Sequence, residues 1–508
     1  MKNERLLPFL VLTVMGLLLG SCTGEESSEE MLASGDDVVD AEIEEYVPDV
    51  DLGSYFTDES LNGTENIKLQ INADVVKTLD DGAVWQIPFF FRSSVWHGNP
   101  WDHPSVLYVP SNLNPARAGY IAVIQQGTDD LDPGIDQDAQ FGRETAIAMG
   151  IPVAVLAKVP HPTLFSSVES ESLSSAHPSC FETFLVESDL EDCARQLTWT
   201  EEKDSFGWAL ESPMVKAYSR AIAAVSLVPE TLANLDPPLE GVPAFDVNQV
   251  ILGGAGKRAR AIWMLASLDE RVQGVWVAAE DRGNLKAFYE NMADSWAGGY
   301  SGIGPLEALE FLKTEYGTTW EYWVDPYRHA SKLEGKNISI ARGTNDPFSP
   351  IGSYARYKDA LPSHQLLLVP NSGYGMGTDD HVTSWRALIA GTTSGAGAHG
   401  LSAQVSRTGA EVEVVIQAPD YAAGPTTKVT VWYVQGQASA DDWDLRDGVW
   451  ESVTTQYDGE LADGKQRHSA VIPLPGLDNW GLFARVSFTD GAGVKQVVSS
   501  APWLSWEN

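Results

Sequence analysis

Residues 247–263, VNQVILGGAGKRARAIW, have the pattern of a strand, a tight turn and a helix in direct succession. The first part, VNQVIL, is short, apolar and rich in β-branched side chains, which favours a buried strand. The glycines that follow it predict a turn. Apolar residues then recur at the spacing of one helical face: Ala259, Ile262, Trp263 and Ala266. We therefore expect the chain to bend sharply at Gly256, between the end of a strand and the start of a helix.

This succession resembles the nucleophile elbow of the α/β-hydrolases, whose usual pattern is G-x-S-x-G. The elbow holds a nucleophilic side chain at the apex of a strained turn. In this sequence the apex residue is Gly256, which has no side chain. Because glycine tolerates the strained backbone, we expect the turn to form without the nucleophile.

The composition limits the classes of function. The chain has 508 residues, which predicts two domains, and 43% of them are hydrophobic, enough for sizeable cores. Its formal charge of −38 excludes nucleic acid as a partner, because binding to phosphates needs a basic surface. The same charge disfavours electrostatic docking to anionic lipid. The balance is typical of the solvated, acidic surface of an exported protein.

The N-terminus has the pattern of a secretory signal peptide. Lys2 and Arg5 precede an apolar core at residues 6–19, which is too short for a comfortable transmembrane helix. Residues 19–22, Leu-Gly-Ser-Cys, resemble a bacterial lipobox. That resemblance implies cleavage before Cys22 and its acylation, and hence a stable lipid anchor in the membrane. The expected location is the bacterial cell envelope, at the outer membrane, facing the periplasm or the cell surface. The alternative is an ordinary signal peptide with an incidental cysteine.

The other two cysteines are Cys180 and Cys193. In an oxidising envelope an even pair favours a disulfide, and the alternative is two free thiols. The sequence around them shows no Cys/His spacing typical of a metal site. We expect neither a metal ion nor a cofactor.

The pattern along the chain changes three times. Residues 23–45 carry many acidic side chains and no Lys, Arg or aromatic residue, so they predict a disordered tether. Residues 46–395 alternate apolar strands with helices, which predicts a mainly parallel, doubly wound α/β sheet. A Gly- and Ser-rich stretch at 391–400 is typical of a linker. Residues 401–508 alternate with period two and predict a small antiparallel β-sandwich.

Short motifs in a fixed order resemble the PhoPQ-activated pathogenicity-related protein family. The resemblance extends from about Tyr46 to the C-terminus, and it depends on the order of the motifs more than on any one of them. The motifs are Ser94-Val95-Trp96, Trp101 with His103, Val159-Pro160, Glu191-Asp192, Trp199, Pro213-Met214, Gly254 to Arg258, Asp281 with Asn284, Asp325-Pro326, Gly343 to Phe348, Pro370-Asn371, Val431-Trp432 and Arg446-Asp447.

The resemblance implies an α/β-hydrolase-like fold and assigns the positions of a catalytic triad. In that family the elbow reads G-x-S-K-R-G, the acid lies in a G-D-x-F loop, and the histidine follows P-N. On this chain the nucleophile position is Gly256, the acid is Asp346 and the base position is Tyr374. The chain order of nucleophile, acid and base is that of an α/β-hydrolase. Three elbow residues match the family and are weak candidates for binding an anion at the start of the helix: Gly254, Lys257 and Arg258.

Two of the three catalytic positions have therefore lost their chemistry. Serine hydrolysis needs an attacking oxygen and a base within about 3 Å of it, and removing both costs little more than removing one. The sequence favours a non-catalytic protein that binds a peptide, another protein or a small molecule. The alternative is an esterase- or peptidase-like hydrolase with a relocated nucleophile. That alternative needs a Ser, Cys or Asp near Asp346 with a base in reach; His381 is one candidate base, unless it only caps a helix that starts near Val382.

The lipobox gives the first testable prediction. In a Cys22→Ser variant the acylation site is lost, so we expect the protein to move from the membrane fraction to the soluble fraction after signal cleavage. Immunoblotting of fractionated cells measures this. A processed variant that still sediments with membranes would contradict the lipoprotein assignment.

Overall fold

The computed structural model describes residues 67–96, 99–125, 137–159, 211–296, 305–313, 315–362, 364–395, 402–408, 411–417, 428–435, 445–460, 466–472, 480–489 and 493–505. The signal peptide, the tether and the three cysteines lie outside these ranges. The lipid anchor on Cys22, the Cys180–Cys193 disulfide and the proposed domain boundaries therefore stay predictions.

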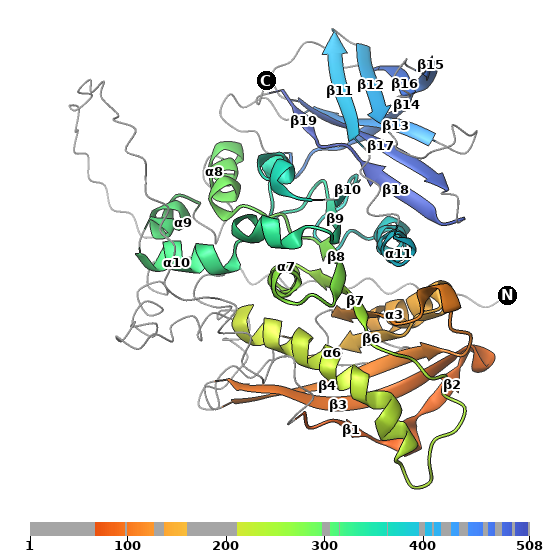
Figure 1. Cartoon of the computed structure of the whole chain (residues 1–508). Coiled ribbons are helices and arrows are strands. Elements are labelled where there is room, and N and C mark those ends of the chain that lie inside the picture. Colours follow the sequence, from red (N-terminus) through yellow and green to blue (C-terminus); the bar gives the residue numbers. More distant parts are fainter. Residues whose placement is uncertain are drawn as a thin grey trace, which may run out of the picture. The chain divides into compact units, whose positions relative to one another are not determined.

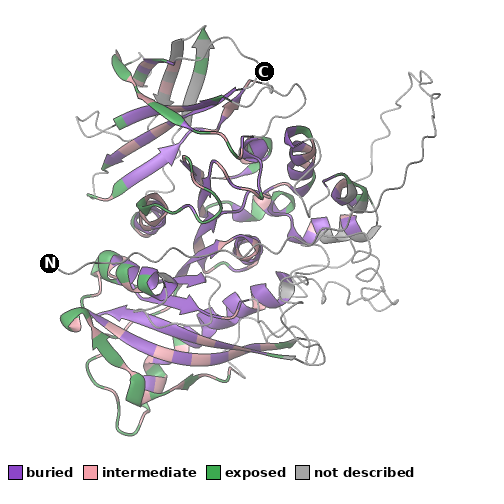
Figure 2. Cartoon of the chain, turned by 180° about the vertical axis from the view of Figure 1, so that it is seen from behind, coloured by how far each residue is buried: buried purple, intermediate pink, exposed green. Residues whose placement is uncertain are grey.

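The centre of the fold is a mainly parallel sheet with the strand order β3-β4-β6-β5-β7-β8-β9-β10 (Figure 1). Its strands are β3 (Val84–Trp96), β4 (Asn99–Pro110), β5 (Tyr120–Gln125), β6 (Val153–Leu156), β7 (Gln249–Ala255), β8 (Val272–Ala278), β9 (Asn337–Gly343) and β10 (His364–Val369). The six neighbouring strands β6, β5, β7, β8, β9 and β10 run parallel to one another. Strands β3 and β4 form a long antiparallel hairpin, and β4 pairs antiparallel with β6. The central strands are almost entirely buried, as Figure 2 shows. Parallel strands that are covered on both faces have this continuous apolar character.

Helices cover both faces of the sheet (Figure 1). On one face α6 (Glu211–Ala233) and α7 (Lys257–Leu268) pack with the sheet into the larger core. On the other face α3 (Gln137–Met149) and α11 (Asp379–Ser394) form a second core around Trp385. The predicted α/β-hydrolase-like class is thereby confirmed. None of the helices in the described ranges is long and apolar enough to cross a bilayer.

The remaining elements complete the α/β part. Strands β1 (Gln70–Ile71) and β2 (Lys77–Leu79) both pair with β3. Between β8 and β9 the chain forms α8 (Leu285–Ser295), α9 (Pro305–Leu312), α10 (Glu315–Val324) and the 3-10 helix η5 (Pro326–Leu333). The short 3-10 turns are η1 (Ala73–Val75), η2 (Asp80–Gly82), η3 (Pro115–Arg117), η6 (Ile351–Arg356) and η7 (Lys358–Ala360).

The C-terminal strands are antiparallel, as predicted, and form two sheets. Strands β13 (Lys428–Gln435), β14 (Glu451–Thr454), β17 (Trp480–Thr489), β18 (Lys495–Ser499) and β19 (Trp503–Leu504) belong to one sheet, and β11 (Ser402–Thr408), β12 (Glu411–Gln417), β16 (Gln466–Val471) and β15 (Gln456–Glu460) belong to the other. Their shared core includes Val431, Leu482 and Ile472.

The sequence did not indicate that the first of these sheets continues the central sheet. Strand β18 pairs antiparallel with β10 at Leu366 and Ser499, and the Leu368 amide donates to Ser499 Oγ at 3.0 Å. Within the described residues this produces a single sheet of 15 strands.

The loops after β9 and β10 meet at a close approach that only glycine permits. A Cβ added to Gly343 would lie under 3.0 Å from the carbonyl oxygens of Ser372 and Gly373, and backbone atoms cannot move aside cheaply. We expect Gly343→Ala to lower the free energy of unfolding by about 1–3 kcal/mol, the usual cost of overpacking. Gly375→Ala, in the loop that contains Ser372 and Gly373 but with nothing within 4 Å, is the control. If Gly343→Ala and Gly375→Ala unfolded at the same denaturant concentration, the two loops would be able to move apart at no cost in stability.

Candidate active site

The elbow predicted at Gly256 is present. Gly256 stands between β7 and α7 with φ 55° and ψ −129°, a backbone conformation that strains other residues. Its amide donates to the carbonyl of Ala278 at 2.9 Å, and its carbonyl accepts from the amide of Ala259 at 2.9 Å. The first bond fixes the turn to the end of β8, and the second begins the helix. The strained turn is thus built without a nucleophilic side chain.

The residues around the apex hold the turn rather than project into a site. A Cβ on Gly254 would lie 3.1 Å from the backbone of Arg258 and from the Tyr218 hydroxyl, so the glycine allows α7 to pack closely. The Arg258 Nε donates to the Val159 carbonyl at 2.7 Å, and the Gln125 side-chain amide donates to the same oxygen. The guanidinium that was a candidate for anion binding therefore ties α7 to the segment after β6.

Lys257, the first residue of α7, carries a perturbed amine. Burial lowers the pKa of Lys257 to about 8, the positive charge of Arg258 adds to the effect, and the carboxylate of Glu211 opposes it. Glu211 itself is fully buried and pairs with Arg260 at 3.2 Å, and burial raises the pKa of Glu211 to about 7. Ionisable groups with little access to water thus lie in the first turn of α7, which follows the elbow, and at the start of α6.

A second buried ion pair, which sequence analysis missed, follows β8. The Arg282 guanidinium contacts the Glu280 carboxylate through bonds of 2.7 and 2.6 Å. Burial alone would raise the pKa of Glu280, but the charge and hydrogen bonds of Arg282 hold it below its usual value. The available signal was positional: both residues directly follow a buried parallel strand, at the edge where the loops of an open α/β sheet form ligand sites.

Asp346 lies in the loop after β9, where the family resemblance placed the acid. It is 1% exposed, and its Oδ1 accepts the Phe348 amide at 2.8 Å. Its Oδ2 has no hydrogen-bond partner among the described residues. Burial raises the pKa of Asp346, whereas the charge of Arg342 and the Phe348 amide lower it. In a working triad a carboxylate oxygen of this kind would accept the proton of a histidine ring.

Arg342 does not neutralise Asp346 by direct pairing. Its guanidinium forms a buried ion pair with Asp281, and it also donates to the carbonyls of Pro350, at 3.0 Å, and Ser349. Asp281 in turn accepts the Tyr357 hydroxyl at 2.5 Å. Arg342 thus organises the loop that carries Asp346.

A small cavity adjoins Asp346. Its volume is about 10 Å³, close to the minimum that accommodates one water molecule. It is lined by Ser295, Trp296, Thr344, Asp346, Ser349, Pro350, Ile351, Leu445 and Arg446. The cavity is about large enough for one water molecule beside Asp346.

Tyr374 lies directly against the apex of the elbow. A Cβ built on Gly256 would lie under 3.0 Å from the Tyr374 hydroxyl, so the phenol occupies the space that a serine side chain would need. The Tyr374 ring packs edge-on against Phe348, with 5.3 Å between centroids. Burial raises the pKa of Tyr374, and the charges of Glu280 and Asp346 raise it further. The structure therefore brings the nucleophile, acid and base positions together, with a tyrosine in contact with the apex.

Ser372 and His381, the second of which was a candidate base, make their contacts elsewhere. Ser372 donates its hydroxyl to the Met376 carbonyl at 2.5 Å and serves the turn. The expected helix start near Val382 was wrong, because α11 begins at Asp379 with Thr378 as its cap. His381 therefore lies inside the first turn of α11, and its ring packs against Phe141 and Trp276 at 6.1 and 6.4 Å. No described hydrogen bond joins it to Asp346.

A Ser–His pair that sequence analysis did not identify lies on the β3–β4 hairpin. The Ser93 hydroxyl and the His103 Nε2 are 2.8 Å apart, and His103 Nδ1 lies 3.1 Å from the Ala157 carbonyl. Both side chains are buried, and the imidazole stacks on Phe91 at 5.0 Å. The strand register shifts between Arg92 and Ser94, so a simple alternation of faces does not predict the pairing. The described residues contain no group of three or more His, Cys, Asp or Glu side chains that could hold a metal ion.

The competition for space at the apex can be measured. Gly256→Ser places a side chain where the Tyr374 hydroxyl lies, so we expect it to cost more stability in the natural chain than in a Tyr374→Ala background. The backbone strain that serine causes at position 256 is present in both backgrounds, so it cancels when the two stability costs are subtracted. The expected coupling energy is about 0.5–3 kcal/mol. Tyr457→Ala, at an exposed tyrosine of the C-terminal part, is the control and should be additive with Gly256→Ser. If the stability costs of Gly256→Ser and Tyr374→Ala were also additive, the side chain at position 256 and the Tyr374 hydroxyl would not compete for the same space.

Among solved structures, the chain is similar to an acetyl xylan esterase from Paenibacillus sp. R4, with 11% identity and a TM-score of 0.40 over 67% of this chain and 94% of that one. It is also similar to a glucuronoyl esterase from Solibacter usitatus, with 11% identity and a TM-score of 0.36 over 63% of this chain and 86% of that one. No functionally curated protein matches it at the sequence level.

The family model matches residues 64–446, a shorter span than the resemblance from Tyr46 to the C-terminus that the motifs indicated. It includes the elbow, the acid loop and the Tyr374 loop. The chain belongs to the PhoPQ-activated pathogenicity-related protein family.

Proposed function

We propose that this protein is a lipid-anchored envelope protein whose α/β-hydrolase-like domain binds a ligand or a partner and does not hydrolyse it at the elbow. The observation that carries the proposal is the Tyr374 hydroxyl, which lies where the side chain of a nucleophile would stand on Gly256. The anchor rests on the lipobox ending at Cys22.

The chemistry of Tyr374 supports the non-catalytic role. A general base must accept a proton near neutral pH. Burial and nearby carboxylates raise the pKa of Tyr374 above its ordinary value of 10, so its hydroxyl stays protonated at neutral pH and is a poor general base. With no oxygen at Gly256 and no base at position 374, Asp346 has neither a nucleophile to activate nor an imidazole to orient.

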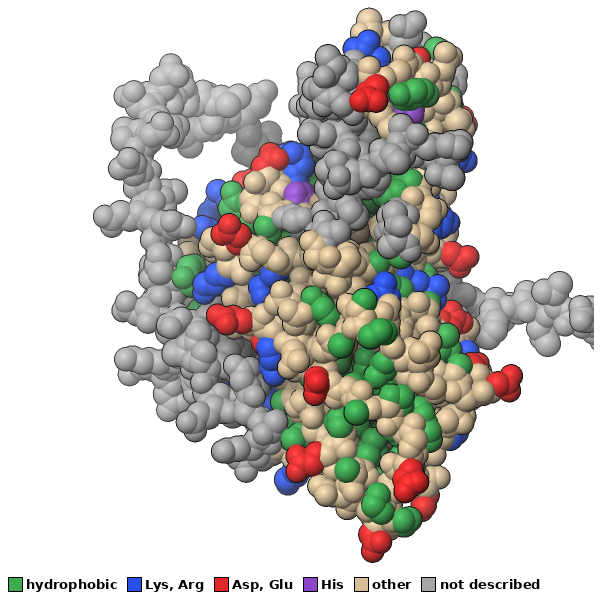
Figure 3. Space-filling view, turned by 45° about the vertical axis from the view of Figure 1, so that its right-hand side comes forward, with side chains coloured by type: hydrophobic (Ala, Val, Ile, Leu, Met, Phe, Trp, Pro, Cys, Tyr) green, Lys and Arg blue, Asp and Glu red, His purple; other side chains and the backbone are tan. Residues whose placement is uncertain are grey.

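The ligand belongs to one of three classes: a peptide, another protein or a small molecule. The charge of −38 favours cationic partners over anionic ones through long-range attraction. On the face shown in Figure 3, the described acidic side chains are scattered among other residues rather than gathered in one patch. This arrangement favours a general attraction over a localised acidic docking site on that face.

A second candidate is acyl transfer by the Ser93–His103 pair, favoured by the 2.8 Å contact between Oγ and Nε2. The Ala157 carbonyl near Nδ1 would take the orienting place of a triad acid. Ser93 Oγ would attack an acyl carbon while His103 accepts its proton and returns it to the leaving alcohol. Water would then release the acid and regenerate the hydroxyl. Against this, Ser93 is only 8% exposed and His103 is fully buried.

The test combines turnover of p-nitrophenyl acetate with labelling by a fluorophosphonate. We expect neither from the natural protein, and neither from Gly256→Ser alone, because an unassisted serine is a weak nucleophile. Gly256→Ser combined with Tyr374→His should gain weak activity that Asp346→Ala removes.

The outcomes separate the two candidates. Turnover by the natural protein that Ser93→Ala removes would establish the relocated site and overturn the binding role. Turnover lost with Asp346→Ala in the natural protein would show that catalysis persists at the elbow. Inactivity of the natural protein and of Ser93→Ala, with gain of activity in the double variant, supports the proposal.

A further inference from the structure

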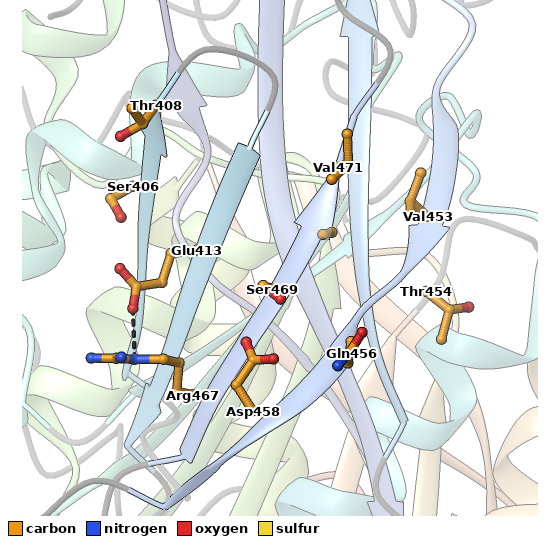
Figure 4. Close-up of a pocket in the computed structure, with 11 residues that line it drawn as sticks. Ser406, Thr408, Glu413, Val453, Thr454, Gln456, Asp458, Arg467, Ser469 and Val471 are labelled. Atoms are coloured by element: carbon orange, nitrogen blue, oxygen red, sulfur yellow. Dashed lines mark ion pairs between the residues drawn. The ribbon is translucent and has the colours of Figure 1, made fainter.

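The four-stranded C-terminal sheet carries a polar groove far along the chain from the elbow. Its volume is about 610 Å³, within the range of small-molecule sites. It is lined by Ser406, Thr408, Glu413, Val453, Thr454, Gln456, Asp458, Arg467, Ser469, Ala470 and Val471 (Figure 4). The sheet β11-β12-β16-β15 supplies most of the lining, and β14 supplies one wall.

The strand register aligns polar side chains into a row across the sheet. Ser406 pairs with Glu413, Glu413 with Ser469, and Ser469 with Gln456. Residues in register share one face, so one side chain from each of the four strands points into the groove. Neighbouring strands are about 4.8 Å apart, a spacing close to the length of one pyranose unit in a linear chain. The row offers hydroxyl and amide groups, which donate and accept hydrogen bonds, and a carboxylate, which accepts them.

The charges in the groove are largely balanced. Arg467 Nε pairs with Glu413 at 2.7 Å, a contact marked in Figure 4. Asp458 adds one exposed carboxylate, because a bulge between Tyr457 and Gly459 interrupts the alternation there. The excess of one negative charge, on a protein of −38, disfavours anionic ligands. The weak net charge gives little attraction for a strongly cationic ligand at this place.

Apolar surface completes one end of the groove. Val471 is 64% exposed although it stands on the lining face, and Val453 from β14 lies beside the same groove. Exposed aliphatic carbon next to a row of hydrogen-bonding groups matches a ligand that has both hydroxyl groups and C–H faces. Sugars have this character.

We propose that this groove binds a neutral, polyhydroxylated chain, that is, a segment of an uncharged polysaccharide. The hydroxyls of successive sugar units hydrogen-bond to Ser406, Ser469 and Gln456 and to the outer donors of Arg467, while Val471 packs on a sugar face. The site is separate from the elbow, so the inference does not depend on whether hydrolysis occurs there.

The experiment is native affinity electrophoresis of the full chain in a polyoxyethylene detergent that contains no sugar. Gels contain xylan, hydroxyethylcellulose, dextran or galactomannan as neutral probes, or polygalacturonate as the anionic probe. The variants are Gln456→Ala and Arg467→Ala. The matched control is Glu460→Gln, which changes an exposed acid on the same strand, β15, that does not line the groove. Thermal melting of each variant reports whether it is folded.

We expect at least one neutral polysaccharide to retard the natural chain and Glu460→Gln equally. Gln456→Ala and Arg467→Ala should weaken the apparent affinity at least tenfold while melting like the natural chain. No retardation by any neutral probe overturns the proposal, as does retardation by polygalacturonate alone. Retardation that both groove variants retain also overturns it, because binding would then lie elsewhere on the protein. If a groove variant fails to fold, Ser469→Ala replaces it under the same criterion.

Discussion

A side chain at position 256 and the hydroxyl of Tyr374 compete for one volume at the apex of the elbow. The turn requires a positive φ, which selects glycine or a strained residue. The phenol fills the remaining space, because the loop after β10 brings position 374 over the turn. Once tyrosine stands there, glycine at the apex is the residue that avoids both strain and collision. Glycine at position 256 and tyrosine at position 374 are thus compatible with each other, whereas a side chain added at position 256 would collide with the phenol.

Buried charges hold the shape of the site. The Arg342–Asp281 pair lies out of solvent and holds the carbonyls of Ser349 and Pro350, which fixes the loop that carries Asp346. Removing one partner of such a pair strands an uncompensated charge, and the cost is large. Selection for folding alone would therefore keep this framework whether or not the site is catalytic. Retention of Asp346 and its loop does not by itself indicate activity.

The sequence predicted the elements whose signals are local. The elbow could be found because a strand, a glycine turn and a helix occupy adjacent residues, and motif order located Asp346 and Tyr374 after their strands. Contacts between distant segments carry no such signal. The Leu368 amide and Ser499 Oγ are 131 residues apart, so the continuation of the sheet through β18 was not visible. The Ser93–His103 contact depends on a register shift within a hairpin, which shows only when strands are paired.

The side chain of Asn345, beside Asp346, donates to the carbonyls of Arg446 and Gly448 at 2.7 Å each. Asn371, in the loop that leads to Tyr374, exchanges two hydrogen bonds with the backbone of Trp450 at 2.8 and 2.7 Å. Residues 446–450 thus fasten both loops of the site from outside the parallel sheet.

These bonds bear on modularity. Deletion or exchange of the C-terminal strands during evolution would remove the hydrogen-bond partners of Asn345 and Asn371. It would also expose the edge of β10. The α/β part is therefore not an interchangeable module. The two parts are expected to be inherited together, and a recombination breakpoint near residue 400 would be selected against even though the sequence there resembles a linker.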